Sequence, residues 1–397
     1  MKNNHLLEIS FFIFLSVLIH SYVSTILGII SADGGGDFQW QPAKCVFEGI
    51  NHYSSYLNND GRCLKFMAQL GEYAQGFYII IFPFTLLEWN TAKIFWSILN
   101  IILIILVPVI LSRKFKLSKN ETCLIIFFIL YSIIVRVNLI NGQQTIFILF
   151  FLILPFVFKS KLSSFLSGIS YFKYNIGYAL FLFFFISKKY KQLFLSIFPC
   201  FLGIFFYSLI TNSNFIDNLF LPIQLMVKNS EVGSTLNRVF LFSFIKYLPI
   251  SSQLIQYLFI LILTFLFNIF FINKIYKIND NLLKLSCLCL LILISTPHWG
   301  HDYILLVPLL IYSVKHYKYN LFLFRINLLV AIYFLHLYNG IQIYINKILY
   351  NLKFNVDILN FIYPYLNIIL LLSILIWNLA NNISYKKLIK KSFSSSF

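Results

Sequence analysis

Residues 92–112 read AKIFWSILNIILIILVPVILS, and the basic cluster RKFK follows directly at residues 113–116. An apolar stretch of ~20 residues has the length that a helix needs to cross the hydrocarbon core of a bilayer. The stretch is continuous rather than alternating, which favours a helix over a barrel strand, because a helix satisfies its backbone hydrogen bonds within the segment. The stretch therefore predicts a transmembrane helix that ends at a cytoplasmic basic cluster.

The whole chain has the same character. Of its 397 residues 59% are hydrophobic and 11% are charged, and the mean hydropathy is +0.82, whereas soluble domains carry roughly 25% charged residues. The net charge of +18 does not indicate nucleic-acid binding, because Lys and Arg fall in short clusters between apolar runs, as the positive-inside rule requires. The composition predicts an all-α polytopic membrane protein with about 10–13 transmembrane helices.

The apolar runs and basic clusters together predict a path through the membrane that starts with the N-terminus inside. The first run, 9–31, is too long for a signal-peptide core and lacks a following small-residue cleavage site, so it predicts a retained span. Residues 76–89 are apolar but short, which predicts a partly inserted or re-entrant segment. Residues 162–187 predict two short helices that meet near Lys173. The other predicted spans are 92–112, 121–140, 145–158, 192–211, 251–272, 282–297, 302–314, 320–338 and 361–379.

This path places four polar elements on one extracytoplasmic face, which predicts a shared site there. The elements are 32–75, 141–144, 212–250 and 296–302. Residues 1–385 form a single transmembrane domain in this prediction, with 32–75 as the first and 212–250 as the second extracytoplasmic loop. Residues 386–397 form a cytoplasmic tail that is basic and Ser-rich.

The first of these loops is rich in acidic residues. It holds five of the 13 acidic residues in the chain, namely Asp33, Asp37, Glu48, Asp60 and Glu72. The segment 41–49 predicts a short helix on the membrane surface, and Asp37 precedes it. Asp37 has two compatible interpretations: an N-cap of that helix, or a general base toward a substrate that arrives from the membrane.

The cysteines are scattered. Cys287 and Cys289 lie within an apolar run and are predicted to be packing residues. Cys45 and Cys63 share the first loop, where an oxidising compartment permits a disulfide, but their spacing leaves the pairing open.

A second polar constellation is Ser295-Thr-Pro-His298-Trp299-Gly-His301-Asp302-Tyr303. His298 and His301 are spaced to face one way on a helical turn, so a metal site with Asp302 is one interpretation. Interfacial anchoring by Trp299 and Tyr303 explains much of the segment without chemistry. A polar cluster at the membrane edge is also a candidate substrate site, and we expect this role rather than a metal.

Four cations violate the positive-inside trend: Arg136, Lys173, Lys228 and Arg238. A charge within the membrane costs about 2.5–3.5 kcal/mol on insertion scales unless it snorkels or finds a partner. Lone snorkelling explains each one separately, but together they suggest an anion at the outer leaflet, such as a lipid phosphate or pyrophosphate. The sequence has no Walker loop, dinucleotide fingerprint or Gly-x-Ser-x-Gly elbow, which argues against soluble nucleotide chemistry.

With these residues assembled, the chain resembles glycosyltransferase family 87 of the GT-C superfamily, the membrane glycosyltransferases that depend on polyprenol-phosphate sugars. The matching positions are Asp37-Phe38-Gln39-Trp40 with Gly49 and Tyr53, Glu72-Tyr73 with Pro83-Phe84, Trp96 to Asn100, Gly142-Gln143, Lys173, Asn229-Ser230 with Arg238, and Ser295, Pro297, Trp299 and His301. Two family features are not matched. This chain does not have its prolines where the family has its double proline, and it has no proline soon after Lys173, where the family usually has one.

The resemblance implies a GT-C type fold whose first extracytoplasmic loop carries short interfacial helices. It implies inverting transfer of a hexose or pentose, mannosyl-like, from a polyprenyl-phosphate donor to a lipid-linked or envelope glycan acceptor, outside the cytoplasm at the plasma (inner) membrane. Asp37 would be the general base and His301 would hold donor phosphate or sugar. The implied substrate-binding residues are Tyr53, Tyr73, Arg136, Gln143, Lys173, Arg238, His298 and Trp299. No cofactor, metal or nucleic acid is expected.

Two alternatives come from other classes of protein. An envelope polysaccharide polymerase or ligase usually carries an Arg- and His-rich catalytic loop late in the chain, whereas the acidic loop here comes first. A flippase or transporter of lipid-linked sugars would do no covalent chemistry and would place charges and broken helices near mid-membrane.

Overall fold

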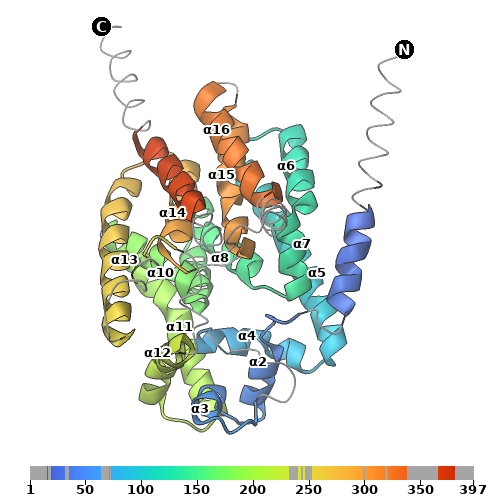
Figure 1. Ribbon diagram of the computed structural model, residues 1–397, viewed down its shortest axis with the longest axis vertical. Coiled ribbons are helices and arrows are strands. Elements are labelled where there is room, and N and C mark those ends of the chain that lie inside the picture. Colours follow the sequence, from blue (N-terminus) through green and yellow to red (C-terminus); the bar gives the residue numbers. More distant parts are fainter. Residues whose placement is uncertain are drawn as a thin grey trace, which may run out of the picture.

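The computed structural model describes residues 16, 19–31, 35–63, 71, 73–231, 240–242, 245, 253–297, 300–317, 321–337 and 365–380. The regular structure in these ranges is helical throughout, and no strand occurs among them. The predicted all-α class is therefore confirmed. Figure 1 shows the helices gathered into one bundle.

Within the described part of the chain, three helices are long and apolar enough to cross a membrane by themselves. They are α5 (Trp89–Phe115), α11 (Tyr190–Ile210) and the part Leu258–Ile275 of α13 (Gln253–Ile275). Shorter apolar helices accompany them, and these are Ile19–Ile30, α4 (Gln75–Thr85), α8 (Thr145–Val157), α10 (Tyr174–Ile186), Phe215–Leu225, α14 (Asn281–Ser295), Arg325–Leu337 and Tyr365–Ala380. The chain is a polytopic helical membrane protein, and the number of spans stays a prediction.

The predicted span 121–140 is broken in the structure. It consists of α6 (Lys119–Tyr131) and α7 (Ile133–Asn141), which meet at a bend of 55°. At the break, the Ser132 hydroxyl accepts the amide N–H of Ile134 and donates to the carbonyl of Leu335 at 2.7 Å. A side chain that bonds the backbone in this way competes with the helical ladder, so the chain turns at Ser132.

Residues 162–187 form the predicted pair of short helices. The first is α9 (Lys161–Ser167), extended by the 3-10 helix η1 (Gly168–Phe172), and the second is α10. Lys173 lies between them with an extended backbone (φ −107°, ψ 94°). Lys173 therefore lies at the break between two helices.

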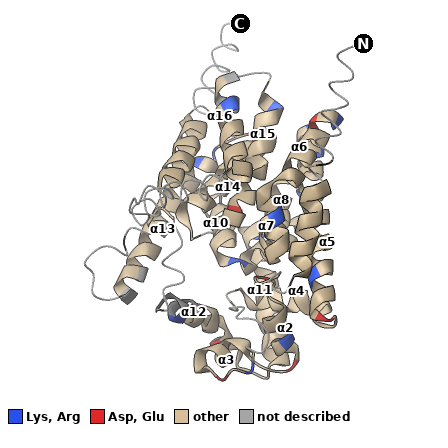
Figure 2. Cartoon of the chain, turned by 45° about the vertical axis from the view of Figure 1, so that its right-hand side comes forward, with Lys and Arg blue, Asp and Glu red and all other residues tan. Residues whose placement is uncertain are grey.

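The first loop contains the short helices that were expected. They are α2 (Trp40–Phe47) and α3 (His52–Asn58), and they lie with α12 (Phe215–Glu231) at the end of the bundle opposite α6 and α16 (Leu321–Ile332) (Figure 1). The predicted N-cap role of Asp37 is wrong, because α2 begins at Trp40 and its N-cap is Gln39, without a side-chain hydrogen bond. Figure 2 shows that charged residues gather mainly toward the two ends of the bundle.

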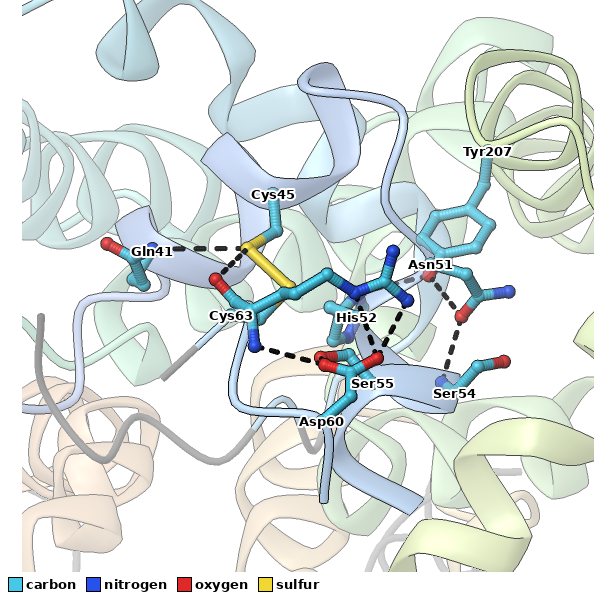
Figure 3. The surroundings of a disulfide bond; sticks show 10 residues. Gln41, Cys45, Asn51, His52, Ser54, Ser55, Asp60, Cys63 and Tyr207 are labelled. Atoms are coloured by element: carbon cyan, nitrogen blue, oxygen red, sulfur yellow. Dashed lines mark hydrogen bonds and ion pairs between the residues drawn. A yellow bond between two sulfur atoms is a disulfide. The ribbon is translucent and has the colours of Figure 1, made fainter. Parts of the chain in front are cut away.

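A disulfide closes the first loop. Cys45 of α2 is bonded to Cys63, with 5.8 Å between their Cα atoms (Figure 3). Asp60 lies beside this bond and accepts hydrogen bonds from Arg62 and Ser55, which hold the pKa of its carboxyl below the usual range. The disulfide and these bonds tie the segment after α3 to α2.

The late helices complete the bundle. Cys287 and Cys289 are buried in α14, which confirms their packing role. The 3-10 helix η3 (Gly300–Leu306) leads into α15 (Val307–His316), and α16 ends in a π-helical turn, Tyr333–Leu337. α14 and η3 are buried along almost their whole length, so the core of the bundle lies around them.

His52 is buried at the start of α3 among Tyr53, Tyr78 and Tyr207. Burial lowers its pKa from 6.5 to about 3, so the folded imidazole stays neutral while the unfolded one binds a proton. As the pH falls from 6.5 toward 3 we expect α3 to lose stability by about 1.4 kcal/mol per pH unit. Hydrogen exchange of the α3 amides measures this loss. A His52→Gln variant with the same pH dependence would contradict it.

Candidate functional site

The segment that carries Asp37 is docked on the end of α7. The amide N–H of Gly35 donates to the Ile140 carbonyl at 2.7 Å, and the amide N–H of Asp37 donates to the Asn141 carbonyl at 2.9 Å. The next residue, Phe38, is fully buried. These contacts fix the backbone on both sides of the Asp37 side chain.

An aromatic pocket on α5 holds Phe38. The Phe38 ring stacks on Trp96 with 5.1 Å between centroids and lies 6.1 Å from the ring of Trp89. Gly142 lies against Phe38 with φ +66°, and a Cβ at this glycine would come within 2.6 Å of the Phe38 Cβ. The Gly142 carbonyl accepts the Trp96 indole N–H at 3.0 Å. Only glycine tolerates both the positive φ and the close approach, which explains the glycine at position 142 of this turn.

Two consecutive glutamines orient Asp37. The Gln143 Nε2 donates to the Asp37 carboxylate, and the Gln144 Nε2 donates to the Asp37 carbonyl at 2.5 Å. Asp37 is exposed. The result is a solvent-accessible carboxylate with a defined orientation, as a general base requires.

The two tyrosines predicted from the resemblance lie behind this carboxylate. The Tyr73 hydroxyl donates to the Gln144 Oε1 at 2.5 Å, and the Tyr53 hydroxyl donates to the Tyr73 carbonyl. Tyr53 is fully buried, whereas Tyr73 is half-buried. The structure therefore places Tyr53 as a support for Tyr73, and Tyr73 as a support for Gln144.

A second cluster surrounds Lys173. Its Nζ donates to the Asp302 Oδ1 at 2.6 Å and to the Thr145 Oγ1 at 2.7 Å, and Thr145 itself donates to Asp302 at 2.5 Å. The His301 Nε2 lies 3.7 Å from the same carboxylate oxygen. Lys173 is thus buried and ion-paired, so the lone snorkelling interpretation is wrong for it.

The start of α8 joins the two clusters. Gln143 contacts Asp37, and Thr145, two residues later, contacts Lys173 and Asp302. Residues two apart at a helix start lie within about 6 Å of each other. The Asp37 carboxylate and the Lys173 cluster therefore flank the N-terminus of α8. The first N–H groups of a helix have no partner within it, so this position favours negative charge.

Several members of this site were not among the predicted site residues. Gln144, Thr145 and Asp302 each bond directly to a predicted residue or to its backbone. Gln144 and Thr145 directly follow the Gly-Gln pair. A buried lysine requires an anionic partner. Asp302 directly follows the predicted site residue His301, and this position could have identified it as the partner of Lys173. Asp302 accepts Lys173 and Thr145 here, whereas His298, its other proposed metal partner, lies outside the described residues.

The 3-10 helix that carries His301 is anchored on α7. The Asn138 Nδ2 donates to the His301 carbonyl at 2.8 Å. The His301 side chain is mostly buried. α7 therefore holds the Asp37 segment at its end and the His301 backbone one turn earlier.

The other two predicted cations that the structure describes, Arg136 and Lys228, take part in none of the described hydrogen bonds of the Lys173 cluster. Arg136 is half-buried on α7, and its Nε finds no hydrogen-bond partner among the described residues. The Lys228 Nζ donates to the carbonyls of Tyr56 at 3.0 Å and Leu57 at 2.8 Å, so this cation caps the C-terminus of α3. Lone snorkelling is wrong for Lys228 as well. Arg238 and Trp299 lie outside the described residues.

Comparison with known proteins identifies a family to which the chain is similar. The model of glycosyltransferase family 87 matches residues 73–297, which is more than half of the chain. No curated protein and no solved structure matches. The matched range includes Tyr73, Gln143 and Lys173, whereas Asp37 and His301 lie outside it. This match, on a polytopic bundle of apolar helices, establishes that the chain belongs to glycosyltransferase family 87 and is a membrane glycosyltransferase.

Proposed function

We propose that the chain transfers a hexose or pentose, mannosyl-like, from a polyprenyl-phosphate donor to a lipid-linked or envelope glycan acceptor. Transfer inverts the anomeric configuration and takes place on the extracytoplasmic face of the plasma (inner) membrane, within one domain that spans residues 1–385. The observation that carries this proposal is the exposed Asp37 carboxylate, oriented by Gln143 at the same helix start that bears the Lys173 cluster.

The reaction requires one proton acceptor and one anion site. Asp37 removes the proton from the acceptor hydroxyl while its oxygen attacks the anomeric carbon, and the bond from that carbon to the phosphate oxygen breaks. The bonding electrons leave with the polyprenyl phosphate. Attack opposite to the leaving group inverts the anomeric centre.

The Lys173 cluster and the start of α8 would stabilise the departing phosphate. An ammonium has three N–H donors, and Asp302 and Thr145 accept two of those of Lys173. The third is then directed to the phosphate, and His301 adds a second donor. The α8 N-terminus contributes partial positive charge to the same position.

The assay is direct. We expect purified protein in detergent or nanodiscs to release polyprenyl phosphate when it is given a polyprenyl-phosphate hexose or pentose and a glycan acceptor. Nuclear magnetic resonance of the product should show the opposite anomeric configuration to the donor. Transfer of sugar from a nucleotide sugar, with no transfer from any lipid-phosphate sugar, would contradict the proposal. A polymerase or ligase would instead release polyprenyl pyrophosphate.

Arg136 is proposed to bind the donor phosphate. We expect Arg136→Ala to raise the KM for the donor about 10- to 100-fold while the KM for the acceptor changes little, because one charge-assisted hydrogen bond is lost. Steady-state kinetics with each substrate varied in turn measure this difference. Arg113→Ala, in the basic cluster at the end of α5, is the control. Equal changes in both KM values would contradict the assignment.

A further inference from the structure

A cavity lies at the opposite end of the bundle from Asp37. Its volume is about 210 Å³. Lysines from four separate segments line it: Lys114 of α5, Lys159 after α8, Lys189 before α11 and Lys284 of α14. Segments far apart in sequence thus bring one kind of charge to one place.

The helices that build the candidate active site also build this cavity. α8 begins at Thr145, beside Lys173, and ends at Val157 in the cavity wall. At 1.5 Å per residue the two ends are about 18 Å apart. The cavity is therefore separate from the Asp37 site, and in the proposed orientation it lies at the inner leaflet.

The cavity is electropositive. Among the described residues that line it, none is acidic. The neighbouring Asp280 lies 3.6 Å from both Lys315 and His316 and so already has cationic partners. Partial burial, and after it the like charge of the nearby Lys159, lower the pKa of the Lys189 ammonium. A bound anion would offset this like charge.

One wall of the cavity is apolar. Phe156, Phe183 and Phe184 line it, and the Lys189 Nζ lies 5.3 Å from the Phe183 ring centroid. Gln192 also lines the cavity, and its buried Oε1 has no hydrogen-bond partner among the described residues. An amide can present its N–H₂ instead by rotating 180°. The wall and the lysines together suit an amphiphile with an anionic head.

We propose that this cavity binds the phosphate group of an anionic membrane lipid through Lys114, Lys159 and Lys189, with the lipid tail against Phe156, Phe183 and Phe184. The positive-inside rule places lysines in cytoplasmic loops, but it does not require lysines of separate loops to meet at one point. These three instead converge on one hollow with an aromatic wall. Phosphate accepts several charge-assisted hydrogen bonds at once, which matches this donor set.

The experiment compares two double variants of equal charge. Lys159→Gln/Lys189→Gln removes two lysines that line the cavity, and the control Lys161→Gln/Lys191→Gln removes two lysines that are close by in sequence, equally exposed and not part of its lining. Each protein is reconstituted in phosphatidylcholine nanodiscs with and without phosphatidylglycerol. Native mass spectrometry then counts retained anionic lipid, and thermal unfolding reports stabilisation.

We expect the cavity variant to bind phosphatidylglycerol about 20- to 30-fold more weakly and to lose the rise in Tm. The control variant Lys161→Gln/Lys191→Gln should keep both, and Lys159→Arg/Lys189→Arg should keep the charge and the binding. An equal rise in Tm with inorganic phosphate alone would retain the phosphate site and overturn the lipid assignment. Equal losses in both double variants would overturn the site itself, because they would indicate general surface charge.

Discussion

Replacing Asp37 by asparagine is expected to lower kcat for sugar transfer about 100- to 10,000-fold, the range typical of losing a general base. The amide keeps the shape of the carboxylate and can still bond to Gln143, so binding of both substrates should change little. The loss should therefore appear in kcat rather than in KM. Release of polyprenyl phosphate from the purified variant measures it.

Glu48→Gln is the matched control for this substitution. Glu48 is an exposed carboxylate in the same loop, at the C-cap of α2. We expect this variant to keep the activity of the parent protein. In size-exclusion chromatography both variants should elute at the volume of the parent protein, and both should retain the Cys45–Cys63 disulfide. A fully active Asp37→Asn protein would exclude Asp37 as the base.

The second large effect concerns the buried ion pair of Lys173 and Asp302. Lys173→Met leaves the Asp302 carboxylate buried with the Thr145 hydroxyl but without the Lys173 ammonium. Asp302→Leu leaves the Lys173 ammonium buried with the same hydroxyl but without the carboxylate. Removal of one partner of such a pair typically costs about 3–5 kcal/mol. We therefore expect each single variant to show a clearly lower Tm in detergent and little transfer activity.

The double variant Lys173→Met/Asp302→Leu separates stability from catalysis. It leaves no uncompensated charge, so its Tm should return most of the way to that of the parent protein. Its transfer activity should stay low, because no ammonium then faces the departing phosphate. Recovery of activity together with Tm would show that Lys173 acts only in folding.

The sequence predicts elements whose signal is local. Residues 145–158 were expected to span the membrane and α8 covers Thr145–Val157, while the pair of helices within 162–187 breaks at Lys173 as expected. In both cases apolar run length and flanking polar residues are sufficient, because every backbone group in lipid must bond within its own helix.

The sequence did not predict two features that depend on distant partners. The bend at Ser132 involves the Leu335 carbonyl, 203 residues away. Within the predicted outer loop 212–250 the structure contains α12, whose Asn218 bonds to Asn51 beside α3 at 3.0 Å. Neither contact leaves a mark on the local pattern of apolar residues.

The same physical reason separates what the sequence predicted about the candidate site from what it did not predict. The residue types alone indicated a carboxylate in the first loop, stray cations at one face and a late histidine block, because charges are rare and costly in an apolar chain. Only the tertiary structure decided how they combine. It joins Asp37 to Gln143 across 106 residues and Lys173 to Asp302 across 129. Such pairs form where helix packing brings their partners together, and packing is a property of the whole bundle rather than of any one segment.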